Sequence, residues 1–382
     1  MRSRSCSSHN LLCVKDAVKR MVDAPAPTPP FRATSTLADL YDLTTYYGRL
    51  QYNWRRMNPL QLRWSAVEIA QANATLAAFD RGDRSRSDAE LWRAAEIREV
   101  TCAPGSDGAM TVPWFFRQSG WALGGTPGIA FLVFSAARWP TSLSAVAFGQ
   151  WANQTHLAGC TYCNSGAAKA SPEFGPRERD LLTAYLLACA TAVPVAFAAA
   201  IAARRFARPL QPFAPYPGVA AANAIGCLAM RRAQYEEGID VRPADGTPAA
   251  PPPPPPRTLA QRMGLAAAPE PELASGGSAP LGQSRAAGWV AVRDTAATRL
   301  VLPLGNFVGV PLILGAAAWL RGGVRPPLVA QVGVTAAVFS LWMPVGAALY
   351  PPTGRLPLAD VEAEIAARAP PGCTGVVYER GV

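Results

Sequence analysis

Six stretches of this chain are mostly apolar and contain no aspartate, glutamate, lysine or arginine. A helix needs about 20 such residues to cross the hydrocarbon core of a bilayer, and each stretch approaches or exceeds that length. A helix satisfies its backbone hydrogen bonds within one segment, whereas an open sheet leaves unpaired groups at its edges. Lipid therefore accommodates helices but not open sheets. The pattern predicts an all-α, polytopic helical membrane protein with five or six spans, at residues 118–137, 139–168, 181–203, 209–230, 300–320 and 326–354.

The segments outside these stretches predict the other domains. Residues 36–116 are charged, with apolar positions at helical spacing and a helix start at Ser87, and predict a small soluble helical region at the membrane surface. Residues 1–35 carry a basic amphipathic pattern typical of a transit peptide, with a disordered segment or surface helix as the alternative. Proline and alanine dominate 242–283, which predicts a disordered linker. Membrane helices 1–4 then occupy 117–241, the last membrane helices occupy 284–354, and a C-terminal tail occupies 355–382.

Charge and cysteine content narrow the class of partner. The net charge of +10 comes from arginines scattered between apolar spans. This arrangement favours contact with anionic lipid headgroups over nucleic acid, which needs a basic face on a folded domain. Two of the eight cysteines, Cys189 and Cys227, fall inside predicted spans. Most cysteines are therefore expected to be small buried side chains rather than disulfide partners.

A polar stripe follows one face of the second stretch. At about 100° per residue, its amides and one hydroxyl fall within an arc of roughly 100°, while Phe148, Trp151 and Tyr162 lie on the other side. Unpaired amides are costly in hydrocarbon, so this face must meet other helices or a wet cavity. The stripe predicts binding of a small neutral or zwitterionic solute, with helix-to-helix hydrogen bonding as the alternative. Its residues are Gln150, Asn153, Gln154, Thr161 and Asn164.

Two asparagines outside the stripe extend the predicted site. Asn223 follows a proline-rich break, after which the chain is expected to re-enter helix near Pro217. The N-terminus of such a short helix attracts a carboxylate. Asn306 lies between Pro303 and Pro311, where a broken helix frees carbonyls for a substrate ammonium, unless these prolines only kink the helix.

The sequence offers few residues for metal binding or catalysis. His156, Cys160 and Cys163 share a helical edge and form a weak alternative metal site, but three ligands without a fourth do not complete a zinc site. The chain has two histidines, no nucleotide-binding loop and no paired carboxylates within its spans, so catalysis and a bound cofactor are not expected. The functions left to consider are transport and scaffolding, and a homo-oligomer is compatible with either.

Several motifs occur in a fixed order between residues 36 and 371. They are Tyr47-Gly48-Arg49-Leu50, Asn58-Pro59, Leu91-Trp92-Arg93-Ala94, Gln150-Trp151-Ala152-Asn153-Gln154, Val219-Ala220-Ala221-Ala222-Asn223, Met230-Arg231, Glu237-Gly238-Ile239 and Ala348-Leu349-Tyr350-Pro351. With the proline-rich segment as an insertion, this order resembles the sideroflexins, multi-pass proteins of the mitochondrial inner membrane. One departure is the loop at residues 103–108, which keeps its proline but lacks the histidine and closing acid of the family's His-Pro-Asp-Thr-Gly-Glu.

The resemblance implies amino-acid transport, with serine as the expected substrate and the lipid bilayer as the surroundings. The family's older association with tricarboxylates and iron leaves a carrier for those solutes as one alternative. A membrane scaffold or assembly factor that recruits partners through the prolines at 251–256 is the other. A tricarboxylate carrier would need cations along its cavity, and the six stretches contain none.

Overall fold

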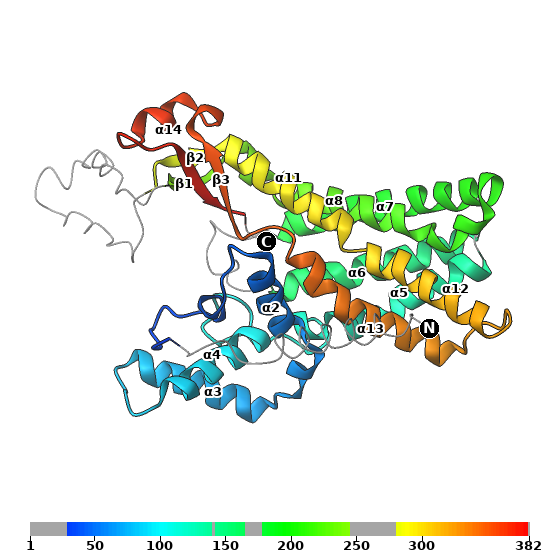
Figure 1. Cartoon of the computed structure of the whole chain (residues 1–382), viewed down its shortest axis with the longest axis horizontal. Helices are drawn as coiled ribbons and strands as arrows, with labels where there is room; N and C mark the ends of the chain where they lie inside the picture. Colours follow the sequence, from blue (N-terminus) through cyan, green and yellow to red (C-terminus); the bar gives the residue numbers. More distant parts are fainter. Residues whose placement is uncertain (1–28, 140–141, 165–177, 245–279, 381–382) are drawn as a thin grey trace, which may run out of the picture. The chain divides into compact units, whose positions relative to one another are not determined.

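The computed structural model describes residues 29–139, 142–164, 178–244 and 280–380. It divides into two compact units (Figure 1). One comprises Met1–Gly226 and Thr298–Tyr350, and the other comprises Cys227–Ala297 and Pro351–Val382. The predicted transit peptide and the proline run at 251–256 lie outside the described residues, apart from residues 29–35.

The N-terminal part of the first unit is helical, as the charged segment predicts. Ser87 is the N-cap of its last helix, where its side chain and that of Glu90 form a capping box. A second box, between Ser65 and Glu68, starts the preceding helix. The elements are η1 (Leu37–Leu40), α2 (Tyr46–Met57), η2 (Pro59–Arg63), α3 (Ala66–Asp80) and α4 (Asp88–Thr101).

An ion pair joins α2 to α4 in this region. Arg55 donates Nε to Oε1 of Glu96 at 2.8 Å and Nη2 to Oε2 at 2.6 Å, and the Gln61 amide donates to Oε1 at 2.7 Å. Burial alone raises the pKa of the Glu96 carboxyl, but the hydrogen bonds and charge of Arg55, with the bond from Gln61, outweigh burial. The pKa of Glu96 is therefore held below its ordinary value.

The Glu96 pair makes stability depend on pH in a defined direction. Because the folded-state pKa is depressed, its stabilisation is complete above the unfolded pKa of about 4.3 and is lost as the pH falls through the folded-state pKa. Glu96→Gln is expected to lower the free energy of unfolding by about 2 kcal/mol at neutral pH, with the deficit shrinking below about pH 4.

Unfolding at a series of pH values measures this deficit. Glu236→Gln is the matched control, because Arg232 and Glu236 are also 2.6 Å apart but their side chains are 70% and 48% exposed. This exposed pair is expected to contribute about 0.5 kcal/mol or less. A deficit for Glu96→Gln that stays constant from neutral to acid pH would contradict the assigned role.

The predicted membrane helices are present, and five are long and apolar enough to span a bilayer. This agrees with the predicted all-α polytopic class. The elements are η3 (Gln118–Gly120), α5 (Trp121–Arg138), α6 (Leu143–Asn164), α7 (Glu178–Phe206), η5 (Arg208–Phe213), α8 (Pro215–Met230), α11 (Arg285–Val301), the π-helix η6 (Gly305–Gly309), α12 (Val310–Leu320) and α13 (Leu328–Ala347). The five spans are Gln118–Arg138, Arg179–Phe206, Arg208–Met230, Arg285–Leu320 and Leu328–Ala347.

The helix α6 is not one of these five, yet it runs antiparallel along the whole of α5. A Cβ on Gly149 would lie 2.5 Å from Leu132, whereas one on Gly124 would lie 2.7 Å from His156. At the far end, Asn164 donates to the Phe116 carbonyl at 2.8 Å. With 22 residues α6 is about 33 Å long, enough to cross the bilayer beside α5. Its polar stripe lowers its hydropathy, so α6 is not among the five spans, although its length and its packing along α5 match those of a crossing helix.

The second unit contains a four-stranded antiparallel sheet in the order β2-β1-β4-β3, which the sequence did not predict. The expected linker 242–283 is therefore too long at both ends, and the expected tail 355–382 is largely folded. Since β1 and β2 are antiparallel neighbours, the sheet holds the two ends of the proline-rich segment side by side. The elements are α9 (Arg232–Glu236), β1 (Ile239–Pro243), β2 (Gly282–Ser284), β3 (Thr353–Pro357), η7 (Leu358–Asp360), α14 (Ala363–Arg368) and β4 (Gly375–Glu379).

Candidate functional site

The two faces of α6 differ in exposure. Gln150 is completely buried, and Asn153 and Gln154 are 7% and 4% exposed. On the opposite face, Phe148 and Trp151 are about half exposed, at 54% and 50%. The apolar face is thus available to lipid, while three amides within about one helical turn point into the protein.

These buried amides are not hydrogen-bonded as buried polar groups usually are. Among the residues that the structure describes, neither Nε2 nor Oε1 of Gln150 has a partner, and Asn153 Nδ2 and Gln154 Nε2 also lack one. A buried donor or acceptor without a partner costs about 1–3 kcal/mol. Three such residues on one face of one helix therefore form a candidate site for a solute that supplies the missing partners.

Gln150 lines a small cavity where four helical elements meet. The cavity has a volume of about 10 Å³, which is room for a single water molecule. Two alanines in the C-terminal half of α7 close it, together with Ala214 and Pro215, where η5 meets α8. Its lining consists of Leu132, Ser135, Ala136, Val146, Gln150, Ala196, Ala200, Ala214 and Pro215.

A row of alanines on α7 forms part of this lining, and the sequence reading missed it. Every fourth residue from Ala184 to Ala200 is alanine, and each is 5% exposed or less. Residues four apart lie on one face of a helix, so the row is a flat surface without protruding side chains. Against it lies Gly218 of α8, where a Cβ would be 2.6 Å from that of Ala196. The regular spacing of alanine was the available signal, since small residues at this interval mark close helix packing in membranes.

Two residues of the predicted stripe are bound to the backbone instead. The Thr161 hydroxyl donates to the Leu157 carbonyl at 3.0 Å. The Asn164 amide donates to the carbonyls of Phe116 and Cys160 at 2.8 and 2.7 Å. The bond to Phe116 fastens the end of α6 to the segment before α5, while the other two lie within α6. Thr161 and Asn164 are therefore not part of the set of unpartnered side chains.

Asn223 does not lie at the start of α8. The helix begins at Pro215, two residues before the predicted position, and Asn223 is half-buried eight residues later. That separation is about 12 Å along the helix axis, so one carboxylate cannot contact both the helix N-terminus and Asn223. Gln150, rather than Asn223, shares a cavity with the first residue of α8.

Asn306 lies in the π-helix η6, where the prolines around it predicted a broken helix. It is 3% exposed, and its Oδ1 has no hydrogen-bond partner within the described part of the chain. The π-helical turns interrupt the regular hydrogen-bond ladder and are frequent at functional sites. The π-helix η6 packs against α5, η5, α12 and α13, whereas α6 packs against α5 and α7. Asn306 and the α6 amides therefore lie on different elements that both pack against α5.

The alternative metal residues form no complete site. His156 and Cys160 are neighbours, with 3.7 Å between Nε2 and Sγ. Across the described residues, no three His, Cys, Asp or Glu side chains are grouped to hold a metal ion. Cys163, the third predicted ligand, is half-buried and does not complete such a group.

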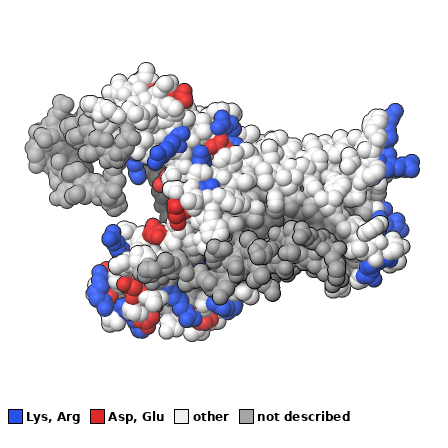
Figure 2. Space-filling model, viewed as in Figure 1, with Lys and Arg blue, Asp and Glu red and all other residues white. Residues whose placement is uncertain are grey.

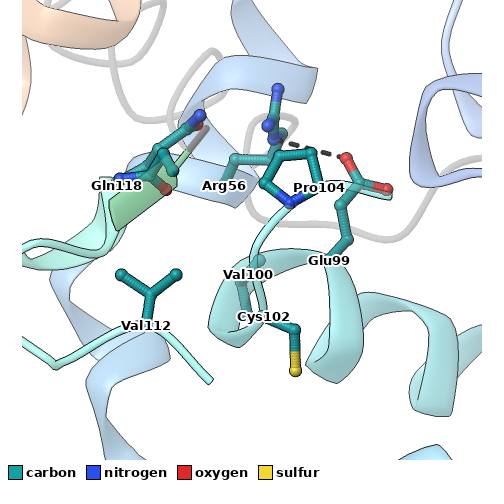
Figure 3. A pocket seen from close by; sticks show the side chains of 8 residues that line it. Arg56, Glu99, Val100, Cys102, Pro104, Val112 and Gln118 are labelled. Carbon is teal, nitrogen blue, oxygen red and sulfur yellow. Dashed lines mark ion pairs between the residues drawn. The ribbon is translucent and has the colours of Figure 1, made fainter. Parts of the chain in front are cut away.

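A second cavity of about 10 Å³ lies where the N-terminal helices meet the ends of α5 and α6 (Figure 3). On one side Arg56 pairs with Glu99, with 3.3 Å between Nε and Oε1. Glu99 also accepts hydrogen bonds from the Tyr52 hydroxyl and the Leu37 backbone. These charged groups already bind one another. This cavity between the surface helices and the bundle is therefore a weaker candidate for a solute site.

Sequence comparisons find relatives that cover most of this chain. The chain is 28% identical to Sideroflexin-5 of Rattus norvegicus, with 93% of each chain covered. It is 23% identical to Sideroflexin FSF1 of Saccharomyces cerevisiae, covering 85% of this chain and 89% of the relative. No solved structure matches. Because the family model for sideroflexins also matches residues 36–382, nearly the whole chain, this multi-pass membrane protein belongs to the sideroflexin family.

Proposed function

We propose that this protein carries a small neutral amino acid, foremost serine, across the mitochondrial inner membrane by alternating access. The observation that supports this most directly is Gln150, which is fully buried beside a cavity with neither amide atom paired to described residues. An amide offers one donor group and one acceptor in a fixed arrangement. A zwitterionic amino acid supplies the complementary groups, a carboxylate acceptor and an ammonium donor.

The charge of the site favours a neutral solute over a tricarboxylate. Within the described part of the chain, the buried unpartnered groups on α6 are three amide nitrogens and one amide oxygen, and none is ionised. Several carboxylates leaving water together would need fixed cations in a low-dielectric interior. A single carboxylate balanced by its own ammonium needs only hydrogen bonds.

The size of the cavity implies that helices must separate for binding. A space for one water molecule cannot hold serine, so this arrangement corresponds to a closed state. The alanine row of α7 provides a smooth surface along which helices can slide by small shear movements. Such a movement would enlarge the cavity without breaking interlocked side chains.

Uptake of labelled serine, alanine, cysteine and citrate by the purified protein in proteoliposomes tests the proposal. Serine uptake is expected to exceed citrate uptake, and Asn153→Ala should lower it about tenfold, because one hydrogen bond to the solute is lost. Asn223→Ala should have a smaller effect, since Asn223 lies outside the unpartnered set. Uptake of citrate alone would favour a tricarboxylate carrier, and no uptake by folded protein would favour a scaffold or assembly factor.

A further inference from the structure

One end of the helical bundle in the first unit carries arginines from three separate turns. Ala136, Ala200 and Ala214 line one cavity, so the ends of α5 and α7 and the start of α8 lie together. The opposite end holds the C-terminus of α13, which Tyr46 and Arg49 bind, so the turn before α13 belongs at the arginine-bearing end. We call this surface the arginine end, and its residues are Arg138, Arg204, Arg205, Arg208, Arg321 and Arg325.

The described helices and turns that carry these arginines contain no acidic residue close to them in sequence. All six arginines are exposed, and the sequence has no aspartate or glutamate in 118–172, 181–235 or 295–359. Figure 2 shows blue atoms without red ones at the right of the view, beyond a white belt of uncharged atoms. The N-terminal helices, in contrast, mix both signs. The arginine end is therefore a one-sided positive surface at the edge of the apolar helices.

Large apolar side chains lie beside the arginines. Phe206 and Trp319 are 80% and 78% exposed, and Val329 is 84% exposed. The Arg205 guanidinium lies 5.4 Å from the centroid of the Phe206 ring. Exposed aromatic rings next to basic groups are typical of the bilayer interface, where acyl chains cover the ring and phosphates meet the cation. A free anion would pair with the charges but leave the apolar side chains in water.

We propose that the arginine end binds the headgroups of anionic phospholipids. Guanidinium groups pair with phosphate in two-point hydrogen bonds, and a membrane surface with negative lipids attracts clustered basic residues at helix ends. The exposed rings fix the depth at which the arginines meet the headgroups. Charge complementarity and the adjoining apolar belt both fit this partner.

Thermal unfolding of the full-length protein in neutral detergent tests the inference. Added phosphatidylglycerol is expected to raise Tm by about 3 °C more than phosphatidylcholine, because a ligand of the folded state stabilises it. Replacing five of the six, Arg204, Arg205, Arg208, Arg321 and Arg325, with glutamine should remove most of the difference. A matched variant that loses the same charge at the N-terminal helices should keep it, with glutamine at Arg32, Arg63, Arg81, Arg86 and Arg93.

A second measurement tests the inference even if the arginine-end variant does not fold. With the unsubstituted protein, the phosphatidylglycerol effect should shrink as salt is raised, since ions screen exposed charges. Three results would overturn the inference: equal stabilisation by both lipids, an unchanged effect in the arginine-end variant, or the same effect from inorganic phosphate alone.

Discussion

Gln150→Met is expected to reduce serine uptake severely while making the protein harder to unfold. The substitution keeps an unbranched side chain of similar size but removes the amide, which is fully buried and unpaired within the described structure. Loss of its hydrogen bonds to the solute should weaken binding about 10- to 100-fold. Removing the unpaired amide should raise the free energy of unfolding by about 1 kcal/mol in the absence of solute.

Opposite signs for activity and stability separate a binding role from a structural one. If Gln150 held helices together, the methionine variant would be less stable. Gln331 provides a control, because its amide donates to the Pro326 carbonyl at 2.8 Å. Gln331→Met should keep uptake and lose a little stability. Uptake by proteoliposomes and unfolding in detergent measure both quantities on the same preparations, and a Gln150 variant that transports normally would remove this residue from the site.

Local patterns made much of the fold predictable. The Ser87 helix start depends on side chains three residues apart, which the sequence displays directly. The buried face of α6 follows from helical periodicity and the cost of placing amides in lipid. The five spans follow from long stretches with few charges, and the hydropathy of α6 keeps it outside them.

The sheet could not be predicted because its strands are short and pair across a long separation. Residues Ile239–Pro243 pair with Gly375–Glu379, more than a hundred residues further along the chain. Strands of three to five residues show too few alternations to distinguish them from loops. Hydrophobic length, which identified the spans, carries no information about such pairings.

The candidate site was predictable as a face but not as a set of contacts. Periodicity places Gln150 and Asn164 in the same arc, yet only the tertiary fold brings the Phe116 carbonyl to Asn164 and leaves the Gln150 amide without a partner among the described residues. The alanine row of α7 was visible at its four-residue spacing, but its role depends on which helices pack against it. Whether a polar side chain finds a hydrogen-bond partner depends on contacts between helices, which the pattern within a single helix does not show.

The structure also gives a physical reason for one motif of the family resemblance. In Tyr47-Gly48-Arg49-Leu50, a Cβ on Gly48 would clash with the Asp42 backbone, so glycine lets the preceding loop fold against α2. Arg49 is 8% exposed and donates to four backbone carbonyls. Two of them, Ala348 and Leu349, follow the last turn of α13, where helix carbonyls lack partners within the helix.

Arg49→Met is expected to lower the free energy of unfolding by about 3 kcal/mol, because buried carbonyls at the end of α13 lose their donors while the apolar stem is kept. Arg49→Lys should recover only part of this loss, since a single ammonium cannot reproduce the planar spread of the guanidinium. Arg63→Met is the control, because Arg63 is exposed and stacks on Trp64 at 4.5 Å. Its effect should stay within about 1 kcal/mol.

Hydrogen exchange locates the Arg49 effect. The guanidinium donates to Ala348 at 2.8 Å, and the Tyr46 hydroxyl donates to the Val345 carbonyl at 3.3 Å, so α2 holds the C-terminal turn of α13 from two positions. In Arg49→Met, amides of that turn should exchange faster, while those near Phe339, in the apolar core shared with α5, stay protected. Faster exchange spread evenly over α13 would mean that Arg49 stabilises the bundle as a whole. Faster exchange confined to its end would make α2 the element that fixes the last span against the surface helices.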